Sequence, residues 1–175
     1  MLELTSLPAK QGDALWIRWG NENKPHQIII DMGTEEIGKK FRERLLSLPE
    51  EQRKIDLLVI THVDRDHIGG VLTCLAEADP IPGLEIHDVW FNGFQHLNNE
   101  SVTADPGSPG LEPMGAAQGE RLSTWLRQQV WNKSFDGAPV RRTPGEPLAK
   151  AAFHQGLTLT VLGPTPDVLA NFIPK

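Results

Sequence analysis

Four side chains that can bind a cation fall within six positions of the segment Thr61-His-Val-Asp-Arg-Asp-His-Ile-Gly-Gly70. They are His62, Asp64, Asp66 and His67. The segment directly follows the apolar run Ile55-Asp-Leu-Leu-Val-Ile60, which is typical of a strand covered on both faces. Imidazole and carboxylate groups gathered at the carboxyl end of a buried strand predict a metal site.

The spacing predicts two pairs of metal ligands. His62 and Asp64 lie two positions apart, so they point to the same side if the strand persists. A turn after Asp64 can bring Asp66 and His67 back toward the same space. One loop would then serve two divalent cations, which at roughly 3.5–4 Å apart share and activate a water in many hydrolases. Two imidazoles and two carboxylates suit zinc, manganese or a mixture of the two.

A polar helix N-terminus is the plainer interpretation of the same residues. Asp64 or Asp66 would cap a helix that begins near Ile68, and the two histidines would be ordinary loop side chains. Capping accounts for one aspartate, but not for four candidate ligands followed by Gly69 and Gly70. We therefore expect metal ligation, with the glycine pair allowing a tight turn.

The rest of the chain predicts an α/β scaffold for this loop. Apolar and alternating runs predict strands at 2–4, 15–19, 27–31, 55–60, 86–91 and 157–162. Helical spacing of apolar residues predicts helices at 35–48, 68–78 and about 122–130. Because strand, helix and strand alternate around the cluster, we expect a parallel βαβ unit with its site at the strand ends. Residues 95–119 are rich in Asn, Gly and Pro and predict a long loop.

Composition fits one soluble domain of 175 residues, with 39% hydrophobic and 23% charged residues. No run approaches the roughly 18 apolar residues that cross a membrane, and the N-terminus lacks a signal-peptide pattern. We therefore expect a cytoplasmic protein that makes no membrane contact. A net charge of −6 argues against electrostatic binding of nucleic acid over the whole surface. It is compatible with a local positive patch formed by Lys, Arg or bound divalent metals.

The metal motif resembles the signature of the metallo-β-lactamase fold superfamily, Thr-His-x-His-x-Asp-His-x-Gly-Gly. Asp64 stands where most members carry a second His, and this variant is similar to the ComEC-like branch, named for the metallo-hydrolase domain of a DNA-uptake channel. Gln11-Gly-Asp-Ala14 and Ile28-Ile-Ile-Asp-Met-Gly33 also resemble motifs of that branch. The resemblance implies a four-layer αββα sandwich with mixed sheets.

The resemblance also implies a role for each residue of the motif. His62 and Asp64 would bind the first metal, and Asp66 and His67 the second. Asp66 would in addition orient the attacking water as the catalytic residue. Asp31 would be a carboxylate that holds a metal ligand in place, with Thr61 beside it. From the sequence alone, closing a turn before Gly33 accounts equally well for Asp31.

Two later parts of the superfamily's site, a bridging Asp and a final His, have no counterpart in this sequence. His96, on the loop after Trp90-Phe-Asn-Gly93, is a candidate substitute. We therefore interpret residues 1–175 as the N-terminal part of one domain, with a loop-rich lid or insertion at about 95–150. The C-terminal half would then be a second chain or fragment. The chain end at Lys175 would result from a trypsin-like cut, or equally from an arbitrary boundary. A cut would imply a protease partner, as expected for an antiphage nuclease that is paired with a protease.

Three functional hypotheses follow. The first is a metal-dependent phosphodiesterase or nuclease acting on DNA, and it depends on Asp64 and on the ComEC-like resemblance. The alternative keeps the site but takes a lactone, thioester or β-lactam. The third is a non-catalytic metal-binding subunit. Arg65 and the basic segment 127–142 discriminate between the first two, because a nuclease should place some of these charges along a groove that leads to the metals.

Overall fold

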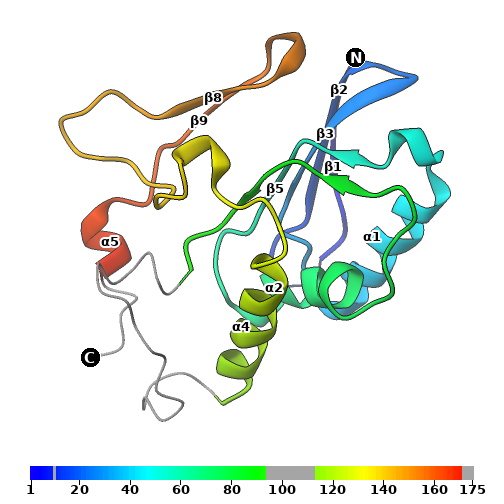
Figure 1. Ribbon diagram of the computed structural model, residues 1–175, viewed down its shortest axis with the longest axis horizontal. Helices are drawn as coiled ribbons and strands as arrows, with labels where there is room; N and C mark the ends of the chain where they lie inside the picture. Colours follow the sequence, from blue (N-terminus) through cyan, green and yellow to red (C-terminus); the bar gives the residue numbers. More distant parts are fainter. Residues whose placement is uncertain (10, 94–112, 171–175) are drawn as a thin grey trace.

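A mixed sheet forms the centre of the computed structural model, which describes residues 1–9, 11–93 and 113–170. Within these residues five strands are ordered β1-β2-β3-β5-β7 (Figure 1). They are β1 (Leu2–Ser6), β2 (Leu15–Asn21), β3 (Lys24–Ile30), β5 (Leu57–Val59) and β7 (Val89–Trp90). The first three are antiparallel, and β3, β5 and β7 are parallel, so the predicted hairpin and the predicted βαβ unit are both confirmed.

Helices cover one face of this sheet (Figure 1). They are α1 (Glu35–Ser47), α2 (Arg65–Val71) with its π-helical continuation η2 (Leu72–Ala76), and α4 (Pro113–Leu126). Phe41 of α1 lies against Trp16 of β2 with the ring centroids 5.7 Å apart. Ile68 of α2 and Leu122 of α4 are buried in the same core cluster. Burial of this apolar surface is the main force that holds the helices on the sheet.

The opposite face carries a smaller β layer. The hairpin of β8 (Lys150–Ala152) and β9 (Thr158–Thr160), which leads into α5 (Pro166–Ala170), lies over a second core cluster. That cluster contains Trp19, Ile28, Leu57, Trp90 and Val161. The predicted α/β class with a mixed sheet is thus confirmed. The described residues form a partial domain with three parts, namely a layer of helices, the central sheet and the two-stranded β8–β9 layer.

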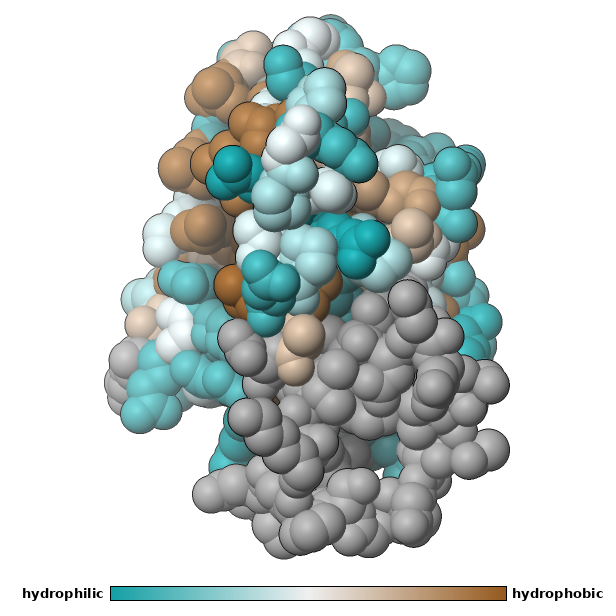
Figure 2. Space-filling model, turned by 90° about the vertical axis from the view of Figure 1, so that its left-hand side faces the viewer, coloured by the Kyte–Doolittle hydropathy of each residue, from teal (hydrophilic) through white to brown (hydrophobic). Residues whose placement is uncertain are grey.

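This second face is covered incompletely by the described residues. Leu2 is 72% and Leu4 66% exposed, although they pair across the sheet with Trp19 and Ile17. Leu162, after β9, is 70% exposed. In the space-filling view from the side of the β8–β9 hairpin, apolar side chains lie at the surface as brown patches (Figure 2). Such an exposed apolar face marks a surface suited to a further polypeptide segment.

Two of the predicted strands are each broken in two. The segment 55–60 forms β4 (Lys54–Ile55) and β5, and 86–91 forms β6 (Glu85–Ile86) and β7. β4 pairs with β6 in a small separate sheet, while β5 and β7 join the central one. The break falls at Asp56, whose carboxylate accepts the backbone N–H of Gln27 at 2.8 Å. The apolar pattern does not reveal this change of sheet.

The helix after the metal motif begins at Arg65, three residues earlier than expected from Ile68. It encloses Gly69 and Gly70, so the prediction that this pair forms a tight turn is wrong. A Cβ on Gly70 would overlap the carbonyl oxygen of Met32, and the Gly70 amide donates to the Gly33 carbonyl at 2.8 Å. The glycine therefore allows close approach of α2 to the end of β3.

The segment after β7 also differs from expectation. A helix was expected at about 122–130, after a loop over 95–119; α4 instead starts at Pro113 and ends at Leu126. Whether 95–150 acts as a lid stays a prediction, and part of it lies outside the described residues. No helix in the described part of the chain has the length and apolarity needed to cross a bilayer.

Replacing Gly70 with Ala should lower the free energy of unfolding by about 1–3 kcal/mol, because the added Cβ forces α2 away from Met32. Gly119→Ala in α4 is the matched control, since a Cβ there meets no atom within 4 Å and should stabilise the helix by up to about 1 kcal/mol. Urea-unfolding midpoints measure both. Equal effects at the two positions would contradict the close-packing role of Gly70.

Candidate metal centre

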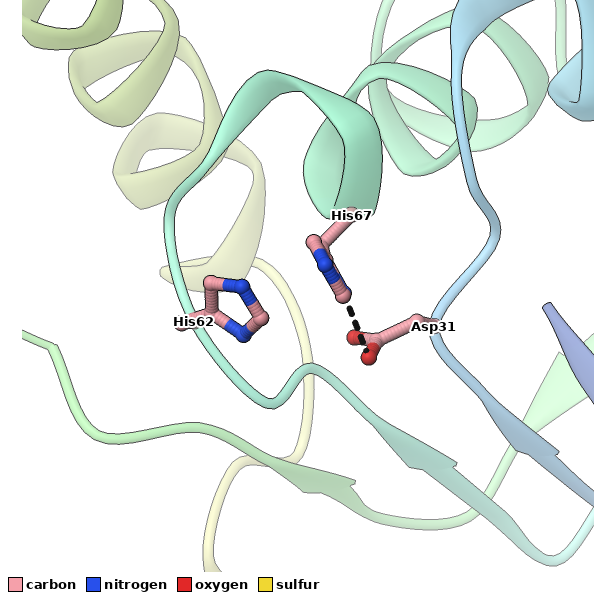
Figure 3. A group of neighbouring side chains, drawn as sticks. All are labelled: Asp31, His62 and His67. Carbon is pink, nitrogen blue, oxygen red and sulfur yellow. Dashed lines mark hydrogen bonds and ion pairs between the residues drawn. The ribbon is translucent and has the colours of Figure 1, made fainter. Parts of the chain in front are cut away.

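The four predicted ligands lie in the loop where β5 leads into α2, at the carboxyl edge of the central sheet. Figure 3 shows that His62 and His67 approach each other from opposite ends of this loop, with Asp31 beside His67 at the end of the neighbouring β3. The two imidazole centroids are 3.6 Å apart. One ligand atom each from Asp31, His62 and His67 lies within 4.8 Å of the other two. The fold therefore gathers distant residues at one point.

The carboxylate of Asp31 is buried and fully engaged by its neighbours. Its Oδ1 accepts the backbone N–H of Thr61 at 2.9 Å. Its Oδ2 accepts the Thr61 hydroxyl at 2.5 Å and Nδ1–H of His67 at 2.8 Å. These are the hydrogen bonds that a carboxylate orienting the metal ligands would make. Asp31 is also one of the three side chains close enough to share an ion, so its predicted role beside Thr61 stays a prediction.

The hydrogen bonds fix the direction in which each histidine presents its lone pair. Thr61 has one hydroxyl hydrogen, and it goes to Asp31, because a carboxylate only accepts. The same hydroxyl oxygen, 2.8 Å from Nδ1 of His62, must then accept a hydrogen from that nitrogen. We therefore assign Nδ1–H to both His62 and His67. Each ring is left with a free lone pair on Nε2, as a metal ligand needs.

These Nε2 atoms each face one aspartate of the motif. His62 Nε2 lies 3.6 Å from Asp64 Oδ2, and His67 Nε2 lies 3.8 Å from Asp66 Oδ2. Two atoms that bind one zinc at about 2.1 Å in a tetrahedral arrangement are about 3.4 Å apart. Both pairs are close to that separation, so each pair could share a divalent cation, while the three side chains close enough to share one ion are Asp31, His62 and His67. The number of cations stays a prediction. The structure thus brings together the two pairs that the sequence predicts.

The capping interpretation of Asp64 is wrong. Asp64 is the residue before α2, but its side chain makes no hydrogen bond to the helix N-terminus. Only its backbone carbonyl contacts the helix, accepting from the amides of His67 and Ile68. The carboxylate is 71% exposed, and so remains available to a ligand.

Two contacts outside the predicted ligand set hold the loop of residues 61–67, called the metal loop below, against the rest of the fold. A Cβ on Gly12, which has φ +73°, would overlap the carbonyl of Asp66, so the turn at residues 11–14 lies directly against the loop. Arg65 donates from Nε to Glu35 of α1 at 2.9 Å. Burial acts to raise the pKa of Glu35, but the hydrogen bond and charge of Arg65, together with Lys39, hold it below its ordinary value. The packing of Gly12 is not visible in the sequence.

The remaining candidate groups do not enter this geometry. His96 lies outside the described residues. Arg65, one of the charges expected to guide DNA, is paired with Glu35. In the basic segment, Arg127, Arg141 and Arg142 are exposed, as surface residues commonly are.

Thr61→Val should weaken metal binding by about 10–100-fold, because it removes the hydroxyl that links His62 to Asp31. Thr61→Ser keeps the hydroxyl and should retain affinity close to that of the parent protein. Chelator competition with Zn²⁺ gives both affinities, and thermal unfolding of the metal-free proteins checks that the fold is unchanged. A Thr61→Val protein with parental zinc affinity would contradict the assigned hydrogen-bond relay.

Comparisons with known proteins fit this site. Residues 8–167 match the family model described as metallo-beta-lactamase superfamily. A hydroxyacylglutathione hydrolase of Aliivibrio salmonicida (strain LFI1238) is 32% identical over 110 residues, covering 57% of this chain and 40% of that protein. The same-named protein of Serratia proteamaculans (strain 568) is 26% identical over 104 residues, covering 59% and 38%.

The chain thus spans about 40% of the length of the curated relatives that it matches. No solved structure gives a significant match. The family model covers nearly the whole chain, including the metal motif and the strands that position it. The chain therefore belongs to the metallo-beta-lactamase superfamily.

Proposed function

We propose that this chain is the N-terminal part of a metal-dependent hydrolase that cleaves an acyl thioester or a closely related ester. The observation that carries the substrate class is the similarity to two proteins named hydroxyacylglutathione hydrolase. The two ligand pairs at His62–Asp64 and Asp66–His67 support the metal dependence. The comparisons favour this alternative over the DNA nuclease that was the first hypothesis, and they give no support to the ComEC-like branch.

The residues of the site have distinct tasks in such a reaction. Bound divalent cations would supply Lewis-acid stabilisation of the carbonyl oxygen and a lowered pKa for water. His62 and His67 would hold them through Nε2, with Asp31 and Thr61 fixing both rings. Asp66, whose carboxylate is 36% exposed, would orient the attacking water by accepting one of its hydrogens. Water adds to the carbonyl carbon, the C–S bond breaks, and the thiol leaves with a proton.

We further propose that another polypeptide segment completes the site and covers the open apolar face. Two ligands per cation leave half of a four-coordinate zinc sphere to other donors. Leu2 and Leu4 leave an apolar surface exposed on β1 at the edge of the central sheet, and Leu162 is exposed beyond β9 in the smaller β layer. A second chain or cleaved fragment, and a protease that makes the cut, stay predictions from the sequence. The intact masses of the species that co-purify would test them.

DNA remains a second candidate substrate because of one residue. Asp64 puts a carboxylate where the superfamily signature has an imidazole, so both ligand pairs consist of one nitrogen and one oxygen. Carboxylate oxygens favour harder ions such as Mn²⁺ and Mg²⁺, which commonly bind phosphate oxygens.

Hydrolysis of a hydroxyacyl thioester by the full-length protein should require Zn²⁺ or Mn²⁺ and should stop on addition of EDTA. Asp66→Asn should lower kcat/KM about 10²–10⁴-fold, because the carboxylate that orients water is lost. Asp136→Asn makes the same chemical change at an exposed turn outside the site and should leave activity unchanged. Absence of thioester hydrolysis with Zn²⁺, Mn²⁺ and Mg²⁺ would overturn the substrate proposal.

Asp64→His separates the two substrate classes. For a thioester hydrolase it restores the superfamily signature, so activity should stay within about tenfold of the parent and shift its preference toward zinc. For a nuclease, the parent should cleave plasmid DNA with Mn²⁺ and the variant should lose this activity. Plasmid cleavage and thioester hydrolysis are measured on the same preparations. DNA cleavage without thioester hydrolysis in the parent would favour the second candidate.

A further inference from the structure

One end of the central sheet is the strand β1, whose outer side is unpaired among the described residues. β1 is the first strand in the order β1-β2-β3-β5-β7, and no described strand pairs with it except β2. Two of its side chains, Leu2 and Leu4, are 72% and 66% exposed. An edge strand that shows both unpaired backbone groups and apolar side chains is a template for pairing with another strand.

The hydrogen bonds between β1 and β2 show which backbone groups face outward. The Met1 ammonium group donates to the Gly20 carbonyl at 2.8 Å, and the Gly20 amide donates back to the Met1 carbonyl at 3.0 Å. Further along, the Leu7 amide donates to the Ala14 carbonyl at 2.9 Å. Because bonded residues alternate along an antiparallel pair, the odd-numbered residues of this segment bond to β2 and the even-numbered ones face away from it. The outward N–H and C=O groups belong to Leu2, Leu4 and Ser6.

We propose that β1 pairs antiparallel with β1 of a second copy of this chain, with Leu4 of one copy opposite Leu4 of the other. This register also sets Leu2 opposite Ser6, so every outward-facing backbone group of the strand gains a partner. The contact is two-fold symmetric and closes on itself, as in most homodimers. It joins two central sheets at their edges and does not depend on the proposed thioester hydrolysis.

The charge on β1 selects this register. Glu3 is the one charged side chain of the strand, and its carboxylate is 3.5 Å from Arg18 and accepts the Thr5 hydroxyl at 3.2 Å. With Leu4 on the two-fold axis, Glu3 lies opposite Thr5 of the second copy. A shift that sets Leu2 opposite Leu4, or an in-register parallel pairing, would bring the two Glu3 carboxylates face to face. Like charges directly opposite each other destabilise a strand pair.

The same register covers exposed apolar side chains. Leu2 and Leu4 lie beside their β2 partners Trp19 and Ile17, on the face of the sheet that carries the second core cluster. Pairing brings Leu4 of the two copies together and extends this cluster across the dimer axis. The further segment proposed above would contact side chains on the face of the sheet, whereas the second copy uses backbone groups at the edge. The two occupants are therefore compatible.

Light scattering during size-exclusion chromatography of the full-length protein should give the mass of a dimer. Leu4→Lys should raise the dimer dissociation constant at least about 10-fold, because two buried leucines are lost and two like charges oppose each other. Leu46→Lys is the matched control, since this leucine is 42% exposed on α1, and it should leave the dimer unchanged. A monomeric parent, as expected if another segment of the chain occupies this edge, would overturn the proposal. So would a dimer that Leu4→Lys leaves intact.

Two further measurements separate strand pairing from misfolding or nonspecific association. Mixing Leu4→Lys protein with Leu4→Glu protein should restore a dimer with one copy of each, because opposite charges then face each other on the axis. Amide hydrogen exchange at Ser6, which faces outward, should be slower in the parent than in Leu4→Lys. The Thr5 amide, which faces β2, is the internal control and should be equally protected in both. Equal exchange at Ser6 in the two proteins, or no dimer in the mixture, would overturn the proposed pairing.

Discussion

The carboxylate of Asp31 is the constraint on which the geometry of the metal loop depends. Asp31 directly follows β3 and has φ +52°, a left-handed conformation that is unfavourable for most residues with a side chain and better tolerated by Asp. Its hydrogen bonds to Thr61 and His67 offset that strain and join the end of β3 to the end of β5 and to α2. Because the carboxylate can only accept, it also decides which nitrogen of each histidine is free.

The metal loop packs against the protein on one side and is exposed to solvent on the other. Gly12 packs against the backbone of Asp66, and Gly70 brings α2 against Met32. On the other side, Asp64 is largely exposed. A loop fixed in this way presents its ligand atoms with little freedom. In the proposed arrangement each pair gives a cation two donors, and the remaining donors would come from solvent, from substrate or from the further segment proposed to cover the apolar face of the sheet.

The sequence predicts those features that depend on local pattern. The β2–β3 hairpin, α1 and the βαβ unit follow from residue type and spacing, and each is found. Of the four predicted metal ligands, His62 and His67 lie close together beside Asp31, and the ligand roles stay a prediction. Features set by contacts distant in the chain are missed. The break at Asp56 depends on its bond to Gln27, and the role of Gly70 depends on the Met32 carbonyl. The pairing of β9 with β8 also escapes prediction, because Lys150–Ala152 has no strand-like apolar pattern.

Because of Asp64, the two ligand pairs offer the same donor atoms, but they differ in burial and in how they are bonded to Asp31. Each pair offers one imidazole nitrogen and one carboxylate oxygen, a symmetry that would suit phosphodiester cleavage between two equivalent ions. However, the His67 side chain is 8% exposed and bonded directly to Asp31, whereas that of His62 is 40% exposed and reaches Asp31 only through Thr61. The pair with the buried imidazole, Asp66–His67, is held more directly, so it should fill first and hold its ion more strongly. One firmly held ion would be enough to polarise the carbonyl of the proposed thioester substrate, whereas two equivalent ions would suit phosphodiester cleavage better.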